Sequence, residues 1–202
     1  MTVQTSSHPS PAATLAAALW PAADTGTGRY LRLVALAIAG SLFIAVSAHV
    51  KVPMVPVPMT MQTFAILVVG MAFGWRLGLA TVVLYIGEGM AGLPVFTNAG
   101  ASPAYLLGPT GGYIVGFAVA AAATGWLAER GWDRSIWTTL PAMAIGTACI
   151  LGLGVLWLST LVGFEKAVAA GFVPFAWGAL VKIALAAAVL PAAWAIVSRV
   201  RR

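Results

Sequence analysis

The chain has 202 residues, of which 61% are hydrophobic and only 8% are charged, and its formal net charge is +6. Soluble domains carry roughly 25% charged residues, so this composition excludes a soluble domain and indicates a multi-pass protein of the lipid bilayer. The basic residues are scattered at the ends of apolar runs rather than gathered in one patch. We therefore interpret the positive charge as a signal of membrane topology and expect no nucleic-acid partner.

The N-terminal segment is rich in Ala, Ser, Thr and Pro. It has no basic n-region, and Pro21 interrupts its short apolar stretch, so it makes a poor signal peptide. We predict a flexible cytoplasmic tail over residues 1–28, with a short amphipathic helix at 14–20, ahead of a membrane domain at 29–202.

Six apolar runs follow, and each is a candidate membrane-spanning helix. About 20 apolar residues cross a bilayer, and backbone amides in lipid must be bonded internally, which favours helices. The expected fold is therefore an all-α integral membrane protein with six transmembrane helices. The predicted spans are 31–50, 60–74, 76–93, 104–128, 137–162 and 174–198.

The basic residues predict the orientation of these spans. An even number of spans places both termini on one side, and the other side then keeps only Lys51, Lys166 and Lys182. Positive charge favours the cytoplasmic side, so both termini are expected inside the cell. The basic residues on that side are Arg29, Arg32, Arg76, Arg130, Arg134, Arg199, Arg201 and Arg202.

The segment between the first two predicted spans, residues 49–60, is apolar yet contains Pro53, Pro56 and Pro58. Three prolines exclude a continuous helix and favour an extended backbone. On the predicted topology the segment lies on the outer side, where a stiff apolar loop suits a lid over a pocket. A loop lying on the lipid interface is the alternative interpretation.

Two charges lie well inside predicted spans, away from the span ends. Lys182 is placed roughly 12 Å from the outer surface if the last helix begins near Pro174. A charge in hydrocarbon costs at least ~2.5–3.5 kcal/mol, so Lys182 either snorkels to the interface or faces a substrate. For Glu88, toward the outer end of the third span, a salt bridge with Lys182, a direct ligand contact and a proton-coupling role all stay open.

Two sets of glycines recur every four residues, a spacing that lets helices approach closely, so we predict tight helix packing at both. They are Gly70, Gly74 and Gly78, and Gly108, Gly112 and Gly116.

Catalytic motifs are missing from the sequence. It has no HExxH, GxSxG or Walker A motif and no Cys/His cluster with metal-ligand spacing. We therefore expect no enzyme activity, no metal and no cofactor in this chain. An ATP-driven function must take its motor from another protein.

Three blocks of sequence resemble the BioY family, the biotin-binding substrate-specificity (S) components of energy-coupling factor (ECF) transporters. The resemblance implies a six-helix S-component bundle in a prokaryotic cytoplasmic membrane, with the loop after the first helix as a lid over an outward biotin site. It also implies a transmembrane coupling protein and two cytoplasmic ATPases, which use the ATP, as partners. The blocks are VPMVPVPMTMQT (52–63), GLPVFTNAG with LLGPTGGYIVGF (92–117) and VPFAWGALVKIALA (173–186).

The same resemblance implies roles for single residues. Lys182 matches the basic residue that ends the family's GDxxK-type motif, a substrate contact, and Asn98 falls where the family has a polar ligand contact. Ala35 and Ala39 resemble the helix surface that docks the coupling protein. An apolar pocket with a few polar groups suits biotin, and its candidate residues are Gln62, Phe64, Tyr85, Glu88, Tyr113, Phe175 and Trp177.

One residue departs from the family pattern, because Gly178 is followed by Ala179 where the motif usually has an acid. Weaker binding, compensation by Glu88, an altered ligand and partner-independent uptake are the open consequences. The competing functional hypothesis is a proton-coupled or stand-alone carrier of biotin or another small anionic vitamin that uses Glu88 and Lys182. A non-transport structural membrane protein is the third hypothesis, and self-association also stays open.

Overall fold

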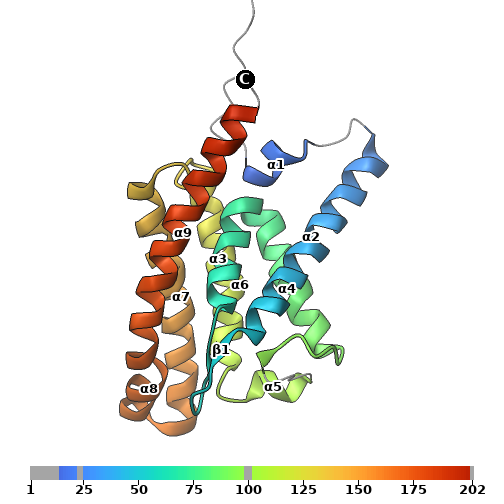
Figure 1. Cartoon of the computed structure of the whole chain (residues 1–202). Helices are drawn as coiled ribbons and strands as arrows, with labels where there is room; N and C mark the ends of the chain where they lie inside the picture. The colour runs from blue at the N-terminus through green and yellow to red at the C-terminus, as the bar shows by residue number, and fades with distance from the viewer. Residues whose placement is uncertain (1–13, 22–24, 98–101, 201–202) are drawn as a thin grey trace, which may run out of the picture.

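The computed structural model describes residues 14–21, 25–97 and 102–200, which form a helical bundle with one short β-hairpin (Figure 1). The strands are β1 (Lys51–Val52) and β2 (Met59–Thr60). The helices are α1 (Leu15–Leu19), α2 (Gly26–His49), α3 (Gln62–Phe73), α4 (Trp75–Met90), α5 (Pro103–Leu107), α6 (Gly111–Ala128), α7 (Ile136–Val162), α8 (Phe164–Gly171) and α9 (Val173–Val200).

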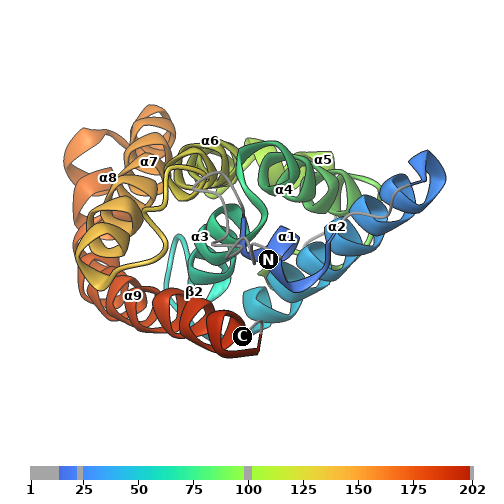
Figure 2. The ribbon, with the colours of Figure 1, turned by 90° about the horizontal axis from the view of Figure 1, so that it is seen from above.

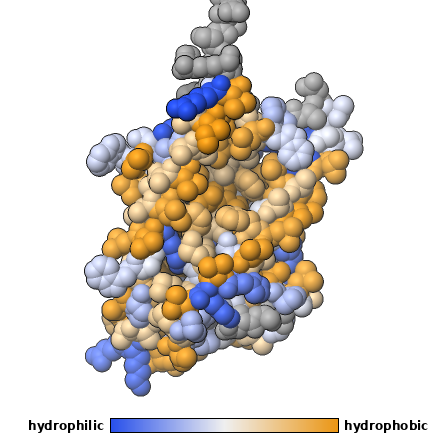
Figure 3. Space-filling view, in the orientation of Figure 1, coloured by the Kyte–Doolittle hydropathy of each residue, from blue (hydrophilic) through white to orange (hydrophobic). Residues whose placement is uncertain are grey.

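Several of these helices are built to cross a membrane. Within the described residues, four stretches are long and apolar enough to do so, namely α2, α6, α7 and the stretch 164–200 that contains α8 and α9. Figure 3 shows apolar side chains spread over the outward faces of α2 and α9. The chain is therefore a multi-pass membrane protein, as its composition predicts.

The other two predicted spans are helices of less than membrane-spanning length. α3 has 12 residues and α4 has 16. The two are separated at Gly74, whose φ of 80° is a conformation that residues with a side chain rarely adopt. The Trp75 amide that opens α4 donates to the Glu129 carboxylate at 3.1 Å, which satisfies one of the amides left unpaired at a helix start.

Two predicted boundaries differ from the structure. The span predicted over 104–128 is divided into α5 and α6, because Pro109 lacks an amide hydrogen and cannot continue the helical bonding. Trp157 of α7 instead donates to the carbonyl of Gly108 at 2.9 Å. The sequence analysis also missed α8, a helix of eight residues between α7 and α9.

The short helix predicted near the N-terminus is present as α1. The Thr14 hydroxyl caps it by accepting from the Ala17 amide at 3.2 Å. α1 packs against α3 and α9, and the Arg32 side chain of α2 donates to the Ala16 carbonyl at 3.1 Å. The extent of a flexible tail over residues 1–28 stays a prediction.

Helix α3 lies at the centre of the bundle, with α2, α4, α6, α7 and α9 packed around it (Figure 2). Its buried residues include Ala65, Ile66, Leu67, Val69 and Met71. A helix that is apolar on all sides is typical of a fully surrounded position. The residues at the start of α3 are therefore held by neighbours on every side.

The close helix packing predicted from the glycine spacing is present at Gly70, Gly78, Gly112 and Gly116, whereas Gly74 and Gly108 lie at helix ends. A Cβ atom on Gly112 would lie 2.2 Å from the Trp157 Cβ, and one on Gly116 would lie 2.9 Å from the Ile150 Cα. A Cβ on Gly70 would lie 2.8 Å from a carbonyl oxygen of α6. These contacts leave no room for a side chain between α6 and either α3 or α7.

The two ends of the bundle differ in charge, because one of them carries Arg29, Arg76, Arg130, Arg134 and Arg199. The start of α2, the α3–α4 turn, the α6–α7 connection and the end of α9 lie at one end, and the hairpin, α5 and α8 lie at the other (Figure 1).

At the end that carries the α6–α7 connection, the buried Asp133 carboxylate accepts from the Trp194 indole at 2.5 Å. Burial raises the pKa of Asp133, with the Trp194 hydrogen bond opposing that rise.

Gly112 supplies a test of the packing. We expect Gly112→Ala to lower the free energy of unfolding by about 1–3 kcal/mol, because the new methyl group overlaps the backbone of α7. Thermal unfolding in detergent should record this as a fall in melting temperature of roughly 2–12 °C. The control is Gly152→Ala, where nothing lies within 4 Å and a gain of up to about 1 kcal/mol is expected. Equal melting temperatures for the two variants would contradict the packing described.

Candidate functional site

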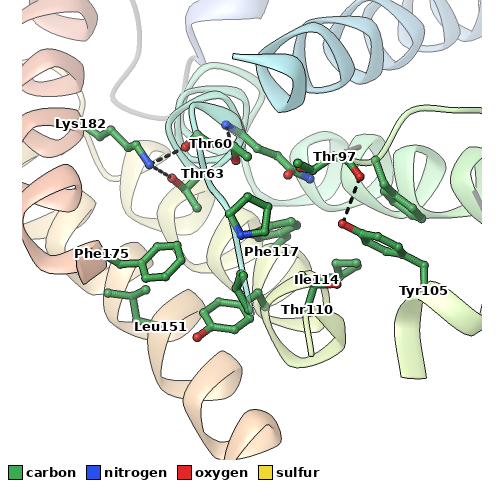
Figure 4. A pocket seen from close by; sticks show the side chains of 15 residues that line it. Thr60, Thr63, Thr97, Tyr105, Thr110, Ile114, Phe117, Leu151, Phe175 and Lys182 are labelled. Carbon is green, nitrogen blue, oxygen red and sulfur yellow. Dashed lines mark hydrogen bonds between the residues drawn. The ribbon is translucent and has the colours of Figure 1, made fainter. Parts of the chain in front are cut away.

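A pocket lies at the hairpin end of the bundle, where the loop between β1 and β2 meets α3, α6, α7 and α9 (Figure 4). Val57 and Pro58 of the hairpin loop close one side of it. Most of the surface that lines it is apolar, and its apolar residues include Ile114, Phe117 and Leu151. Its polar lining residues are Thr60, Gln62, Thr63, Thr97, Tyr105, Thr110, Tyr113 and Lys182.

Lys182 directs its ammonium group into this pocket. Its Nζ donates to the Thr60 carbonyl at 2.5 Å and to the Thr63 hydroxyl at 3.0 Å (Figure 4). Both acceptors are neutral and both lie where β2 leads into α3. The ammonium therefore points toward the centre of the bundle. In the alternative, snorkelling, it would extend toward the water interface. It is positioned to meet an anionic group that enters from the hairpin side.

Gln62 and Tyr85 form a hydrogen-bonded pair behind the pocket. The Gln62 amide donates to the Tyr85 hydroxyl at 2.8 Å, and that hydroxyl donates to the Val95 carbonyl at 2.9 Å. Gln62 lines the pocket, whereas Tyr85 is fully buried and does not. Tyr85 thus fixes the orientation of Gln62 and leaves the amide oxygen of Gln62 for other donors.

An aromatic wall lies beside this pair. Tyr85 contacts Phe96 edge-on at 5.4 Å between ring centroids, and Phe96 stacks on Tyr105 at 5.1 Å. Burial raises the pKa of the Tyr105 phenol, so this hydroxyl stays protonated at neutral pH. The wall offers flat apolar surface with one hydroxyl at its edge, which suits a small ring system.

Tyr113 and Phe175 form the opposite aromatic pair. Their rings stack at 6.0 Å, and the Tyr113 hydroxyl donates to the Gly171 carbonyl at 2.7 Å. A Cβ atom on Gly154 would lie 2.2 Å from the Tyr113 ring. Tyr113 is therefore clamped between α7 and the end of α8, and both predicted wall residues line the pocket.

Three further predicted residues, Glu88, Trp177 and Phe64, are not part of the pocket lining. The Glu88 carboxylate accepts a hydrogen bond from the Ser41 hydroxyl of α2, so it makes its contact away from Lys182. Trp177 is 77% exposed, which suits lipid contact. Phe64 packs against the core instead. Asn98 lies outside the described residues, and its role stays a prediction.

Ala35 and Ala39, predicted to dock a coupling protein, lie on α2. Ala39 is exposed and Ala35 is half-buried. Gly40 beside them faces inward, since a Cβ there would lie 2.7 Å from Thr81 of α4. The position of Ala39 is compatible with docking, and the docking itself stays a prediction.

Sequence reasoning missed the threonines of the pocket. Thr60 and Thr63 hold Lys182, and Thr97 and Thr110 line the far side. All four lie inside the first two sequence blocks that carry the family resemblance. Their nearness to Pro and Gly, in segments that cannot form an uninterrupted helix, was the available signal.

The enclosed space of the pocket is about 50 Å³. Ligand pockets typically measure about 300–1,000 Å³, so a vitamin-sized ligand needs a wider pocket than this one. Because Val57 and Pro58 form one wall, outward movement of the hairpin is the direct way to enlarge it. Met59 packs against α9 at Gly178, where a Cβ would lie 2.1 Å from its sulfur.

A second, smaller void adjoins Lys182 at Ala179. It measures about 20 Å³, and its lining includes Thr63, Thr147 and Phe175. Residues three apart share a helix face, so Ala179 and Lys182 both face this void. The side chain that the family pattern places at position 179 is a carboxylate, and the void lies where that group would project.

The structure thus shows a multi-pass helical membrane protein with a small pocket beneath the β1–β2 hairpin. The BioY family model matches residues 14–199. The chain is 39% identical over 145 residues to the biotin transporter BioY of Thermotoga maritima, covering 71% of this chain and 85% of that protein. It is 38% identical over 154 residues to a probable biotin transporter BioY of Pyrococcus horikoshii, covering 76% and 89%.

A solved structure shows the same fold. It is the crystal structure of the S-component for biotin from an ECF-type ABC transporter, with a TM-score of 0.72 and 22% sequence identity. The alignment covers 89% of this chain and 95% of that one. The chain belongs to the BioY family, as the three sequence blocks predict. The relatives are named as transporters, in agreement with the expectation that the chain is no enzyme.

Lys182 supplies a test of the hairpin contacts. Lys182→Met removes both hydrogen bonds to residues 60 and 63, and each bond to a charged group is worth about 1.5–3 kcal/mol. We expect amide hydrogen exchange at residues 59–62 to accelerate roughly tenfold or more in the protein without ligand. Lys166→Met is the control, because it removes an exposed charge at the same end and leaves Thr60 untouched. Unchanged exchange in Lys182→Met would contradict a hairpin tethered to α9.

Proposed function

We propose that this chain is the biotin-binding S component of an ECF-type transporter and mediates biotin uptake across a prokaryotic cytoplasmic membrane. Its membership of the BioY family and its resemblance to biotin transporters along most of the chain support this proposal. The observation that carries it is the pocket itself, which combines aromatic and aliphatic walls with one cation. Biotin has an apolar ring and chain, a planar ureido group and one carboxylate.

The proposed topology has six transmembrane helices, α2, α3, α4, α6, α7 and α9, with both termini inside. In the bundle these six run alternately toward and away from the hairpin end (Figure 1). The arginines at the opposite end favour a cytoplasmic position for that end. The pocket then opens to the outside, beneath the hairpin. α3 and α4 are shorter than the length that usually spans a bilayer. Because α3 is surrounded by other helices, its length does not have to match the thickness of the lipid.

Within the pocket, we assign the carboxylate of biotin to Lys182. An entering carboxylate replaces the Thr60 carbonyl and the Thr63 hydroxyl as acceptor for the ammonium, and the hairpin moves outward as the lid. The ureido group then meets the polar far side, where Gln62 and Thr97 lie. Ala179 leaves Lys182 without the acidic neighbour of the family pattern, so the ligand carboxylate is its natural counter-charge.

The partners of the proposal follow from the family. The coupling protein docks on α2 at Ala35 and Ala39, and two cytoplasmic ATPases supply the energy. This chain then binds no ATP and needs no cofactor of its own.

Calorimetric titration with biotin and with biotin amide tests the assignment of Lys182. Loss of a charge-assisted hydrogen bond worth about 1.5–3 kcal/mol raises Kd by roughly 10- to 150-fold. We expect this loss for biotin in Lys182→Gln, while the uncharged amide binds the native protein and the variant alike. Lys166→Gln is the control and should bind as the native protein does.

Two results would count against this reading. Absence of saturable biotin binding by the native protein overturns the proposed function. An equal loss for biotin and its amide in Lys182→Gln overturns only the pairing with the carboxylate, and places the ammonium against the ring instead.

The energy source separates the ECF mechanism from the proton-coupled carrier. Because the Glu88 carboxylate is bonded to Ser41 rather than to the pocket, we expect Glu88→Gln to keep most biotin uptake in cells. Uptake should also survive an uncoupler while the ATP level is held constant, and should stop when ATP is depleted. Uptake abolished by the uncoupler and by Glu88→Gln would favour the carrier.

A further inference from the structure

A second hollow lies on the outer surface of the bundle, separate from the pocket. It measures about 570 Å³ and opens between the start of α4, the second half of α6 and the middle of α7. It has an almost purely apolar lining, formed by Trp75, Ala122, Ala123, Trp126, Leu127 and Ile145. A surface hollow of this kind on a membrane-spanning bundle faces lipid.

The walls of this groove are held firmly. Ala122 and Ala123 give it a shallow floor, because their side chains end at one carbon. The indoles of Trp75 and Trp126 rise at one end, and the two segments are fixed together because a Cβ on Gly125 would lie 2.5 Å from the Trp75 amide nitrogen. The groove is thus a built feature of the α4–α6 contact.

Two guanidinium groups lie at the tryptophan end. The Arg130 Cζ is 3.3 Å from the centre of the Trp126 ring, and an Arg130 nitrogen donates to the Trp126 carbonyl at 2.8 Å. The Arg76 Cζ is 5.1 Å from the centre of the Trp75 ring. These contacts hold both charges over the indoles that line the groove.

One carboxylate lies nearby and does not cancel this charge. Glu129 accepts from the Trp75 amide at 3.1 Å and so caps the start of α4. The same bond shows that residues 75 and 129 are neighbours, which brings the adjacent Arg76 and Arg130 to one end of one groove. Two positive charges against one negative charge leave a net attraction for anions.

From this geometry we infer a binding site for an anionic phospholipid. One acyl chain lies in the groove over Ala122 and Ala123, and the phosphate group meets Arg76 and Arg130. Tryptophan is enriched at the headgroup level of membranes, and basic pockets between transmembrane helices on the cytoplasmic side bind anionic headgroups. Arginine matches phosphate geometry through paired donors. The site is independent of what the hairpin pocket binds.

Quenching of tryptophan fluorescence by brominated lipids tests this site. The purified full chain is placed in phosphatidylcholine vesicles with increasing brominated phosphatidylglycerol, and separately with brominated phosphatidylcholine. The groove signal is the part of the quenching that Trp126→Phe removes. At about 1 kcal/mol for each basic residue, two arginines give the anionic lipid a preference of roughly 25-fold.

The charge and groove variants decide the outcome. We expect Arg76→Gln with Arg130→Gln to bring the preference close to one, and the matching lysine pair to keep part of it. Ala123→Leu should lower quenching by both lipids, because its side chain fills the groove. Thermal unfolding in detergent reports whether each variant is folded.

The control pair is Arg29→Gln with Arg199→Gln, exposed arginines at the same end of the bundle. It should keep the full preference. The inference is overturned if the native protein shows no preference, if the preference survives loss of Arg76 and Arg130, or if the control pair abolishes it equally.

Discussion

The ammonium group of Lys182 is the constraint around which the ligand site is arranged. A charge in the apolar interior costs at least ~2.5–3.5 kcal/mol, and one hydrogen bond from a charged donor returns about 1.5–3 kcal/mol. Two such bonds, to Thr60 and Thr63, are therefore enough to hold the charge inside the bundle. Because both acceptors lie at the start of α3, the charge on α9 also fixes the hairpin that precedes it.

The helices around this charge are positioned by residues that lack side-chain bulk. Gly178 admits Met59 of the hairpin against α9, while Gly112 and Gly154 bring α6 and α7 together around Tyr113. α3 stays central because every face of it is packed. A membrane gives little hydrophobic drive for helices to associate, so such close packing supplies much of the stability.

Hydropathy and charge predicted the parts of this structure that depend on single segments. Long apolar runs predicted the helices, the prolines at 53, 56 and 58 predicted an extended, non-helical segment, and the isolated charge singled out Lys182. The antiparallel pairing of β1 with β2 was not predicted. Contacts between distant segments were out of reach. Nothing in the sequence around Glu88 indicates that its partner is Ser41. Tyr85 was expected in the pocket wall, but it lies behind the pocket and supports Gln62. That contact depends on the fold and could not be read from the sequence. The break at Gly108–Thr110 was also missed, since a proline inside an apolar run can equally kink a continuous helix.

The hydrogen bonds of Lys182 affect what the affinity for a ligand depends on. In the proposed complex an incoming carboxylate does not meet a bare charge, because Thr60 and Thr63 already accept from two of the three ammonium donors. Observed affinity is then the difference between two complete sets of contacts, one internal and one with the ligand. Weakening the internal set makes the chain bind more tightly, so a less stable lid and a stronger binder can be the same protein. Natural variation at position 63 would therefore tune uptake through this internal set, because the Thr63 hydroxyl is its side-chain acceptor.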